Sequence, residues 1–509
     1  EDGVETGNQI VHNLGIQTKC HPTLPCEPTN LAPGGATSGT AGQKSKGILI
    51  PSDNTASTFW ITNPDNIYRD NVAAGSDQIG FWFALSEHPT GAFEGTETIW
   101  PRRTNVREFS GNTAHSNFDG LMFDRGPKAD GSFSVQGSNY HYGYADPADT
   151  NSQQLVSVFD NFTGYKNRHG AVWGRGELHL FKNLRVADNA IGYTHAAGAV
   201  GRAPYTSQVV DSLFVGETDN IGNPRTPVEI AYGRSMPNDI PDFPIRGYEY
   251  YDMRHDVVNT TFVNFQPNDT RDASALSYLM YTSFGMSTEN AIEGAKFVNA
   301  KPVSFPQVVR RWASDFGRGN SWRGATIHDK DGSVSGVRNA YIVLDNGIAS
   351  DEQACEIKPD WNAAVCRGDF GYFNLGGNMG FGSEPIADPI MLSRNGRRWE
   401  YTGQTTVRSG AEVRVETARD ALSLSLTEMD NGSSVIFELP GFTNAAAGTQ
   451  QSSLAALREA SDTSYFKDDK GLWVKLVASN TGAAAGPARG PAAPTGLQVS
   501  RHIQVSSAR

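Results

Sequence analysis

Short apolar runs alternate with polar corners along most of the chain. In residues 156–194 the same pattern occurs twice, so that Asn161 and Asn183 lie 22 residues apart, as do Asn167 and Asn189. A repeat of this period, made of three short β segments, predicts successive coils of a parallel β-helix. One coil cannot bury its own apolar face, so its inward Val, Leu, Ile and Phe must pack on the coils above and below.

The polar corners of this repeat explain its asparagines and glycines. Both residue types tolerate the left-handed backbone conformation that a sharp corner requires. The asparagine amide can also bond to the equivalent residue one coil away. We therefore predict that the four repeated asparagines occupy matching corners of adjacent coils, with equivalent Cα atoms about 4.8 Å apart.

The pattern changes towards the C-terminus. We assign residues 1–384 to the β-helix and count Val337–Val343 among its coils. From Ile390 to Val477 apolar and polar residues alternate, with Asn-Gly turns, which predicts an antiparallel β-sandwich over residues 385–481. Residues 482–509 are a linker and tail rich in Pro, Ala and Gly. The predicted fold class is all-β: a right-handed parallel β-helix with side loops, followed by a small antiparallel β-sandwich.

Composition and charge narrow the class of function. With 54 Gly, 38% hydrophobic and 19% charged residues, the chain has a globular composition. It has no apolar run of about 18 residues, so we expect no membrane span. The net charge of −12 is unfavourable for a polyanionic substrate, and we expect no nucleic acid partner. Basic residues nevertheless gather between positions 161 and 185. Such a cluster is expected in a groove that binds an anionic glycan, but it also occurs on ordinary solvated coil faces.

Four cysteines form two close pairs. The short spacings favour local disulfides between Cys20 and Cys26 and between Cys355 and Cys366, and hence an oxidising, extracellular compartment. A zinc site with His21 is the alternative, although neither pair has the usual two-residue spacing.

Several longer motifs resemble one known family. They occur in order between Glu1 and Val343 and include Phe59–Asn66 (FWITNPDN), Ala73–Ser76 (AAGS), Gly80–Phe83 (GFWF), Asn112–Asn117 (NTAHSN), Tyr165–Ala171 (YKNRHGA) and Ser212–Glu217 (SLFVGE). The family is that of the cell-migration-inducing hyaluronan-binding protein and the transmembrane cell-surface hyaluronidase.

The resemblance implies a β-helix that acts outside the cell on the anionic polysaccharide hyaluronan, with calcium dependence. It also implies an N-terminal β-sandwich and further coils before Glu1. Independently, the start at Glu1 resembles the middle of a coil, so we expect the chain to be a piece of a longer protein. We therefore expect an upstream N-terminal fragment as a partner. The charged residues credited with activity in the family lie in that upstream part, so the resemblance assigns no catalytic residue here.

The residues themselves suggest a candidate site. Glycoside hydrolysis needs two carboxylates, or an acid and a base, facing each other across a groove. β-Elimination at a uronic acid instead needs a cation to neutralise the carboxylate and a base. We therefore take as catalytic candidates His115, Asp119, Asp124 and His169, and as substrate-binding candidates His88, Arg125, Arg168, Trp173 and Arg175. A structural role in corner hydrogen bonds is the alternative for His115.

Asp329 and Asp331 are the candidate calcium ligands. Alternate acidic residues before Gly332 resemble the start of a calcium loop, whereas the twelfth position is Ala340 instead of the usual Glu. An Asp-Gly turn is the alternative interpretation.

Two classes of function remain open. The first is a secreted glycan-active protein that binds or depolymerises an anionic polysaccharide, as a hyaluronidase-like glycosidase or a lyase. The second is a non-catalytic extracellular structural or adhesion module, because a solenoid offers long surfaces that need no chemistry.

Overall fold

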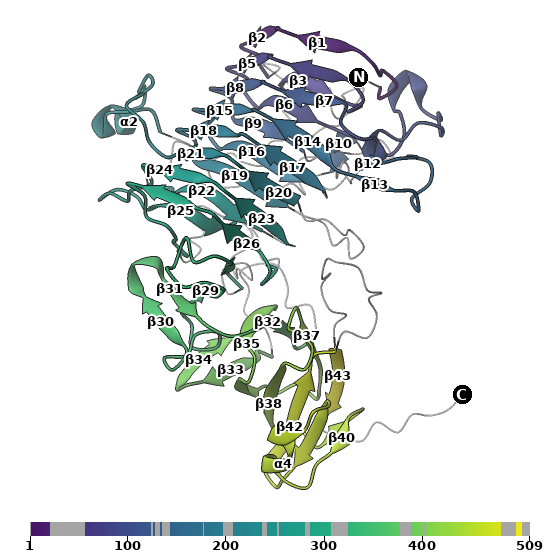
Figure 1. The fold of residues 1–509 in the computed structure, drawn as a ribbon, viewed down its shortest axis with the longest axis vertical. Helices are drawn as coiled ribbons and strands as arrows, with labels where there is room; N and C mark the ends of the chain where they lie inside the picture. The colour runs from purple at the N-terminus through teal and green to yellow at the C-terminus, as the bar shows by residue number, and fades with distance from the viewer. Residues whose placement is uncertain are drawn as a thin grey trace. The chain divides into compact units, whose positions relative to one another are not determined.

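The structure is a computed structural model, and its described part falls into two compact units (Figure 1). Side chains are described for residues 2–20, 56–123, 143–176, 178–195, 207–236, 242–251, 254–279, 286–306, 324–376, 388–401 and 403–479 and for Leu497 and Val499, with additional backbone at 126–127, 133–134, 196 and 495–500. The first unit reaches Leu279 and includes Ile292–Ser304. The second comprises the residues from Phe316 onward together with Met280–Ala291 and Phe305–Val308.

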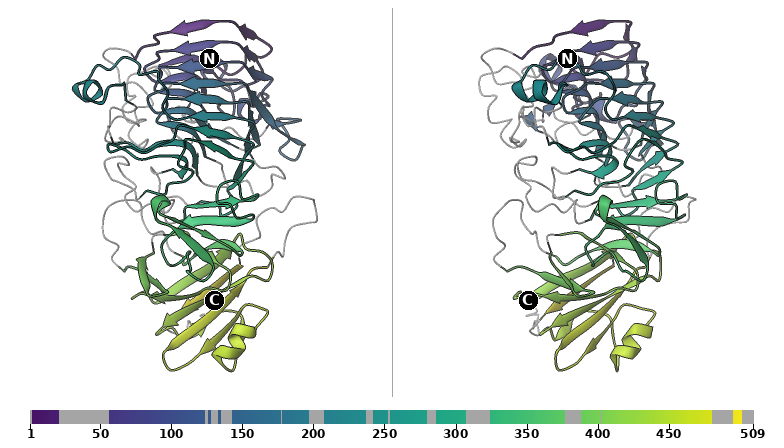
Figure 2. Two further views of the ribbon diagram at one scale, coloured as in Figure 1. Left: turned by 60° about the vertical axis from the view of Figure 1, so that its left-hand side comes forward. Right: turned by 90° about the vertical axis from the view of Figure 1, so that its left-hand side faces the viewer.

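Three parallel sheets build the first unit, and each of the first seven coils contributes one strand to each sheet (Figures 1 and 2). Sheet 1 contains β1 (Gln9–Val11), β4 (Ile67–Arg69), β7 (Glu108–Ser110), β14 (Ser157–Asp160), β17 (His179–Lys182), β20 (Ser207–Val210), β23 (His255–Val258) and β26 (Ala291–Glu293). Sheet 2 contains β2 (Leu14–Ile16), β5 (Val72–Ala74), β8 (Thr113–His115), β15 (Thr163–Tyr165), β18 (Arg185–Ala187), β21 (Leu213–Val215), β24 (Thr261–Val263) and β27 (Lys296–Val298). Sheet 3 contains β3 (Ser57–Ile61), β6 (Ile79–Phe83), β9 (Asp119–Met122), β16 (Gly170–Arg175), β19 (Ile191–Ala196), β22 (Ile245–Tyr250) and β25 (Ala273–Tyr278).

Side loops leave the coils between these strands. They contain the 3-10 helices η3 (Gly91–Phe93) and η4 (Pro101–Arg103), the helix α2 (Pro227–Tyr232), and the short antiparallel pairs β10 (Gly126–Pro127) with β11 (Phe133–Ser134) and β12 (Gly143–Tyr144) with β13 (Gln154–Leu155). None of the helices in the described part of the chain is long and apolar enough to cross a membrane.

The predicted coil register is confirmed. Asp160 pairs with Lys182 and Tyr165 with Ala187, so both asparagine pairs lie at equivalent positions of adjacent parallel coils. Their roles differ. Asn161 and Asn183 are exposed corners in the left-handed conformation, with φ of 53° and 57°. Asn167 and Asn189 are buried and bond to each other.

The buried asparagines form ladders along the helix. Asn167 Oδ1 accepts hydrogen bonds from the backbone N–H and side-chain amide of Asn117, at 3.2 and 3.1 Å. Asn189 Oδ1 accepts the same two bonds from Asn167, at 2.9 and 3.1 Å. A second ladder joins Asn13, Asn71 and Asn112. Each rung satisfies buried donors that the corner would otherwise leave unpaired.

Aromatic rings fill the space between the three sheets. Phe83 stacks on Phe123 with centroids 4.5 Å apart, and Phe159 stacks on Phe181 at the same distance. These rings are fully or almost fully buried. The inward apolar positions therefore stack from coil to coil, as the sequence predicts.

The second unit is built mainly from antiparallel strands. Its first strands are β28 (Thr326–Asp329), β29 (Ala340–Leu344), β31 (Ala363–Cys366) and β30 (Cys355–Lys358), with the 3-10 helix η6 (Pro359–Trp361). One following sheet contains β35 (Thr405–Arg408), β32 (Phe370–Asn374), β37 (Ala421–Thr427), β43 (Thr495–Ser500) and β39 (Asn444–Ala445). The other contains β34 (Arg397–Glu400), β33 (Met391–Arg394), β36 (Glu412–Glu416), β38 (Ser434–Pro440), β42 (Gly471–Val477), β41 (Ser464–Lys467) and β40 (Thr449–Gln450), with the helix α4 (Leu454–Glu459) nearby.

Two expectations about this region differ from the structure. Val337–Val343 is not a β-helix coil, because β29 runs antiparallel to β28 after a turn at Asp329–Ser335. Residues 495–500, which we placed in the tail, form β43 and pair with β37, with Leu497 and Val499 buried. Antiparallel pairing thus begins well before the predicted boundary at residue 384.

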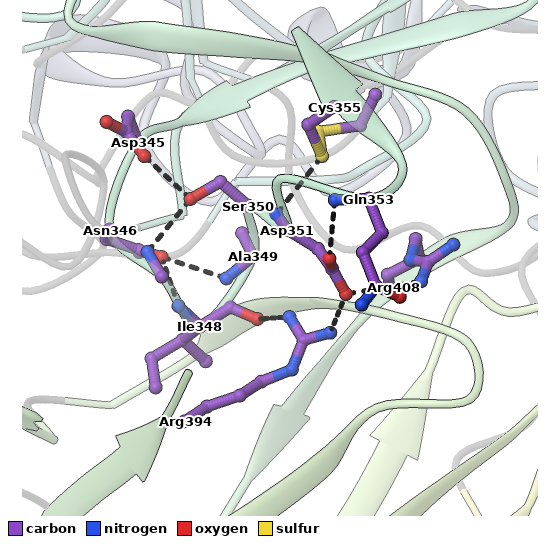
Figure 3. The surroundings of a disulfide bond; sticks show 12 residues. Asp345, Asn346, Ile348, Ala349, Ser350, Asp351, Gln353, Cys355, Arg394 and Arg408 are labelled. Carbon is purple, nitrogen blue, oxygen red and sulfur yellow. Dashed lines mark hydrogen bonds and ion pairs between the residues drawn. A yellow bond between two sulfur atoms is a disulfide. The ribbon is translucent and has the colours of Figure 1, made fainter. Parts of the chain in front are cut away.

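The predicted disulfide between Cys355 and Cys366 is present, and its Cα atoms lie 4.0 Å apart across the β30/β31 pair (Figure 3). Beside it, Asp351 Oδ2 accepts a hydrogen bond from Arg394 at 2.9 Å, and Arg394 also donates to Ile348 O at 2.7 Å. Cys26 lies outside the described residues, so its pairing with Cys20 stays a prediction.

Glu428 is a buried carboxylate of the second unit, and its backbone is left-handed, with φ of 61°. It accepts hydrogen bonds from Ser287 Oγ at 2.8 Å, from the Thr288 N–H at 2.7 Å and from Thr288 Oγ1 at 2.9 Å. Burial raises its pKa to about 7, and Glu289 acts in the same direction, against the hydrogen bonds from Ser287 and Thr288.

Removal of one ladder rung tests the role of the buried asparagines. Asn167→Ala should lower the free energy of unfolding by about 2–4 kcal/mol, because it leaves several buried donors and acceptors without partners. Asn161→Gly is the control, since glycine adopts the same left-handed corner. Urea denaturation should show little change in the free energy of unfolding for the control. An equal loss of stability in both variants would contradict the different roles of the buried and the exposed asparagine.

The pH dependence of stability tests Glu428. Its folded pKa of about 7 exceeds the ordinary value of 4.5, so its contribution to stability is complete below about pH 4.5 and is lost as the pH rises through about 7. The free energy of unfolding should fall by up to about 3 kcal/mol over this window. Glu428→Gln should remove this part of the slope in urea denaturation, whereas equal slopes in both proteins would argue against it.

Candidate functional site

Five of the described candidate residues, Asp119, Arg168, His169, Trp173 and Arg175, lie on sheet 3 or at the corner that leads into it. Inward positions of this sheet, such as Tyr193, contact the core ring Phe181. Outward positions form a separate cluster, in which Trp82 and Met122 are buried and Trp173 packs against them half-buried. Trp173 and Arg175 therefore lie on the same outward side of β16, about 7 Å apart along the strand.

Asp119 and His169 are brought together from adjacent coils. His169 Nδ1 donates to Asp119 Oδ1 at 2.8 Å, and the Gly170 N–H donates to the same oxygen at 3.1 Å. Both side chains are only 2% exposed. Glycine at position 170 suits this contact, because a Cβ there would lie 3.2 Å from the carboxylate oxygen. The pair forms because β9 and β16 are neighbours in sheet 3.

Arg168 extends this group to the surface. It is exposed at the corner before β16 and donates to Asp77 O at 3.0 Å. Its guanidinium lies 5.7 Å from the Phe118 ring centroid, and the His169 ring stacks on the same Phe118 at 5.4 Å. A cation, a histidine and a carboxylate thus lie close together.

His115 and His88 do not join this group. His115 lies on β8 of sheet 2, where its ring stacks on Tyr165 at 4.7 Å, and burial lowers its pKa. His88 lies in the side loop after β6, where Nδ1 is 3.0 Å from Ile99 O and the ring contacts Trp100. Asp124 and Arg125 lie outside the residues whose side chains are described.

Sequence reasoning missed a buried charged pair on the same face. Glu249 is fully buried and forms an ion pair with Arg246 Nε, while Thr194 Oγ1 donates to its other oxygen at 2.7 Å. Residues three apart in a regular strand point to opposite faces. In β22, however, Gly247 has no partner in the neighbouring strand β19, and the alternation of faces is interrupted there. Arg246 and Glu249 therefore both point outward. The only sequence signal was two charges within an aromatic strand.

A buried histidine cluster inside the helix was also missed. Tyr193 donates its hydroxyl to His195 Nδ1 at 2.8 Å, and His195 Nε2 donates to Gly176 O at 2.9 Å. Burial lowers the pKa of His195 to about 4 and also lowers the pKa values of His179 and His255. These histidines are therefore neutral packing groups at physiological pH.

The separation of the carboxylates limits the chemistry of this face. Asp119 on β9 and Glu249 on β22 are three strand spacings apart, about 14 Å between their backbones. Paired glycosidase carboxylates lie roughly 5–9.5 Å apart. These two residues therefore do not form such a pair. The arrangement instead offers a histidine with an orienting carboxylate beside Arg168, and Arg175 lies at the other end of β16, about 16 Å further along the strand.

Asp329 and Asp331 lie in a hydrogen-bonded turn between β28 and β29. Asp329 accepts hydrogen bonds from the backbone N–H groups of Gly332, Val334 and Ser335 and from the Ser335 hydroxyl. Asp331 accepts one from the Ser333 N–H. These bonds stabilise the Asp-Gly turn that is the alternative interpretation of the motif, and calcium ligation by Asp329 and Asp331 stays a prediction. No group of metal-ligating side chains occurs elsewhere among the residues that the structure describes.

The first unit has three parallel sheets, which are joined by short corners and carry side loops. This architecture defines a parallel β-helix protein. The sequence model of the CEMIP beta-helix family matches residues 1–122. This part of the chain belongs to that family, which confirms the resemblance predicted from the motifs.

Known relatives extend the similarity over most of the chain. It is 31% identical over 400 residues to the human cell surface hyaluronidase CEMIP2, covering 73% of this chain and 28% of that protein. It is 28% identical over 476 residues to the mouse cell migration-inducing and hyaluronan-binding protein, covering 85% and 34%. Protein DDB_G0287365 of Dictyostelium discoideum is 32% identical over 390 residues, covering 72% and 34%. The chain thus spans about a third of the length of these relatives.

Substitution of Asp119 tests whether the Asp119–His169 pair stabilises the coil. Asp119→Ala should lower the free energy of unfolding by about 2–4 kcal/mol, because it removes the acceptor of two buried donors. Asp119→Asn should cost less, since its amide oxygen can still accept one of these bonds. Urea denaturation at neutral pH measures both. Unchanged stability in Asp119→Ala would show that the pair does not stabilise the coil.

Proposed function

We propose that this chain is the β-helix part of a secreted or cell-surface protein that binds, and within the longer protein helps to depolymerise, an anionic polysaccharide of the hyaluronan type. The observation that carries the proposal is the grouping of Asp119, His169, Arg168, Trp173 and Arg175 on two adjacent coils. It occurs in a chain similar to proteins named as hyaluronidases and as hyaluronan-binding. The disulfide between two strands of the second unit supports an oxidising compartment.

The grouping suits uronic acid chemistry. Arg168 and Arg175, at opposite ends of β16, could form charge-assisted hydrogen bonds with separate uronate carboxylates, and Trp173 offers an aromatic edge for a sugar ring. His169, oriented by Asp119, could hold or move a proton at Nε2, since Nδ1 is committed to the carboxylate. This favours a lyase-type step, or a hydrolase that takes its carboxylates from the longer protein. The family resemblance also implies a calcium requirement, for which Asp329 and Asp331 are the candidate ligands.

A non-catalytic binding module is the second candidate. The observation that favours it is the burial of Asp119 and His169, which are each 2% exposed and bonded to one another. In that case the pair stabilises the coil, and only Arg168 and the half-buried Trp173 and Arg175 contact the glycan.

Removal of the two arginines tests the proposed site. The Arg168→Ala/Arg175→Ala variant should bind hyaluronan oligosaccharides about 1–3 kcal/mol more weakly than the wild type, because it loses charge-assisted hydrogen bonds. Wild-type affinity should fall steeply with ionic strength, whereas a neutral glycan should show little dependence on salt. Calorimetry measures the affinities, and thermal unfolding checks the fold.

Two outcomes of this experiment separate the candidates. Equal binding by wild type and the folded double variant at low ionic strength would remove this site. Size-exclusion chromatography measures the length of hyaluronan that has been incubated with the full-length protein. Binding without any change in polymer length would favour the non-catalytic module.

A further inference from the structure

The outward face of sheet 2 is a long, regular and solvent-facing surface. The three-residue strands between β2 and β27 bury their middle residue, as at Ala73, Ala114, Val186, Phe214 and Phe262. The first and third residues therefore point outward. We call these sixteen positions, two from each of eight strands, the outer strip. Its first row is Leu14, Val72, Thr113, Thr163, Arg185, Leu213, Thr261 and Lys296, and its third row is Ile16, Ala74, His115, Tyr165, Ala187, Val215, Val263 and Val298.

Nine of the sixteen positions of the outer strip are aliphatic, and none is acidic. Of the nine exposed large hydrophobic residues in the described part of the chain, it holds Leu14, Ile16, Leu213 and Val298, which are 38–66% exposed. Three more, Ile221, Val228 and Ile230, lie in the loop that contains α2. Arg234 anchors this loop to Asp188, at the corner after β18, by an ion pair of 2.7 Å.

The only full charges on the strip are positive. Arg185 and Lys296 are exposed, and neither forms an ion pair with another described residue. On neighbouring sheet 1, by contrast, Lys182 pairs with Asp160 at 3.3 Å and Arg69 pairs with Glu108 at 2.6 Å. In a chain of net charge −12, sixteen positions with two free cations and no carboxylate favour an anionic partner.

Polar and aromatic groups lie between these charges. His115 and Tyr165, on adjacent strands, stack nearly parallel at 4.7 Å and 13°. Thr113, Thr163 and Thr261 add hydroxyls in the first row. Flat rings and aliphatic groups can pack on the C–H faces of sugar rings, and the hydroxyls can bond to sugar hydroxyls.

The dimensions of the strip favour one extended chain over a folded protein. Seven strand spacings give a length of about 34 Å, and three residues give a width of about 10 Å. The resulting area of about 340 Å² is well below the roughly 800 Å² that each partner of a stable protein interface buries. Strands β5 to β24 are paired on both sides, so a peptide could not add to them as a further strand. A second copy of the strip would place cations opposite cations.

We infer that the outer strip binds an extended anionic polysaccharide across the strands of sheet 2, as a second glycan surface separate from the outward face of sheet 3. The inference rests on the proposed function. Arg185 and Lys296 lie three strand spacings apart, about 14 Å, and contact separate carboxylates of the polymer. The polymer thus lies along the strip while another part of it reaches sheet 3, so long chains bind more tightly than short ones.

Charge substitutions test the outer strip. Affinity for high-molecular-mass hyaluronan is measured at low ionic strength for the wild type, Lys296→Gln and Arg185→Gln. Each substitution should weaken binding about two- to fivefold, as expected for an exposed ion pair. Binding of a short hyaluronan oligosaccharide at sheet 3 should stay unchanged. Lys182→Gln is the matched control, because it removes the same charge from the neighbouring sheet.

Asp211 provides a variant with the opposite expected sign. It is an exposed left-handed corner residue beside Leu213, with φ of 51°, and equivalent positions of adjacent coils hold Asn183 and Asn259. Asp211→Asn therefore keeps the corner and removes a nearby negative charge. It should strengthen binding of the long polymer by up to about twofold.

The outcomes separate this inference from the proposed function. If Lys296→Gln and Lys182→Gln weaken binding equally, the effect is net charge alone and the strip is refuted, even when Arg168→Ala/Arg175→Ala abolishes oligosaccharide binding. If the wild type binds no hyaluronan, the proposed function fails and this inference fails with it. Stronger competition by poly-glutamate than by hyaluronan would assign the strip to an acidic peptide and overturn the inference.

Discussion

The register between neighbouring coils is the constraint on which the first unit depends. It is fixed at the corners, where the amide oxygen of one buried asparagine accepts two hydrogen bonds from the asparagine of the preceding coil. A shift by one residue would break these bonds and turn inward rings outward. Because the register is fixed, residues 50 positions apart, such as Asp119 and His169, meet on one face.

Much of the β-helix could be predicted from the sequence because its geometry is periodic. The distance of 22 residues between Asn161 and Asn183 corresponds to one coil, and the paired strands confirm it. The pattern did not reveal that Asn161 serves as an exposed left-handed corner while Asn167 serves as a buried rung. Both roles use the same amide, and only burial distinguishes them.

The remaining features could not be predicted because they depend on pairing between distant segments. Arg246 and Glu249 share a face only because the register skips Gly247. The apolar run at Val337–Val343 could equally form a parallel or an antiparallel strand, and the hydrogen-bonded turn at Asp329 decides the direction. At the candidate site, the sequence selected Asp119 and His169 separately. It could not show that they bond to each other, nor that His115 belongs to another sheet.

The asparagine rungs have a consequence for how such a protein can change during evolution. Successive rungs join residues that are 58, 41, 50 and 22 positions apart in the chain, yet each spans one coil. Formation of the rung therefore does not depend on the length of the segment that connects the two corners. Insertions and deletions can accumulate in those segments without disturbing the stack, so new recognition loops can arise one coil at a time on an unchanged frame.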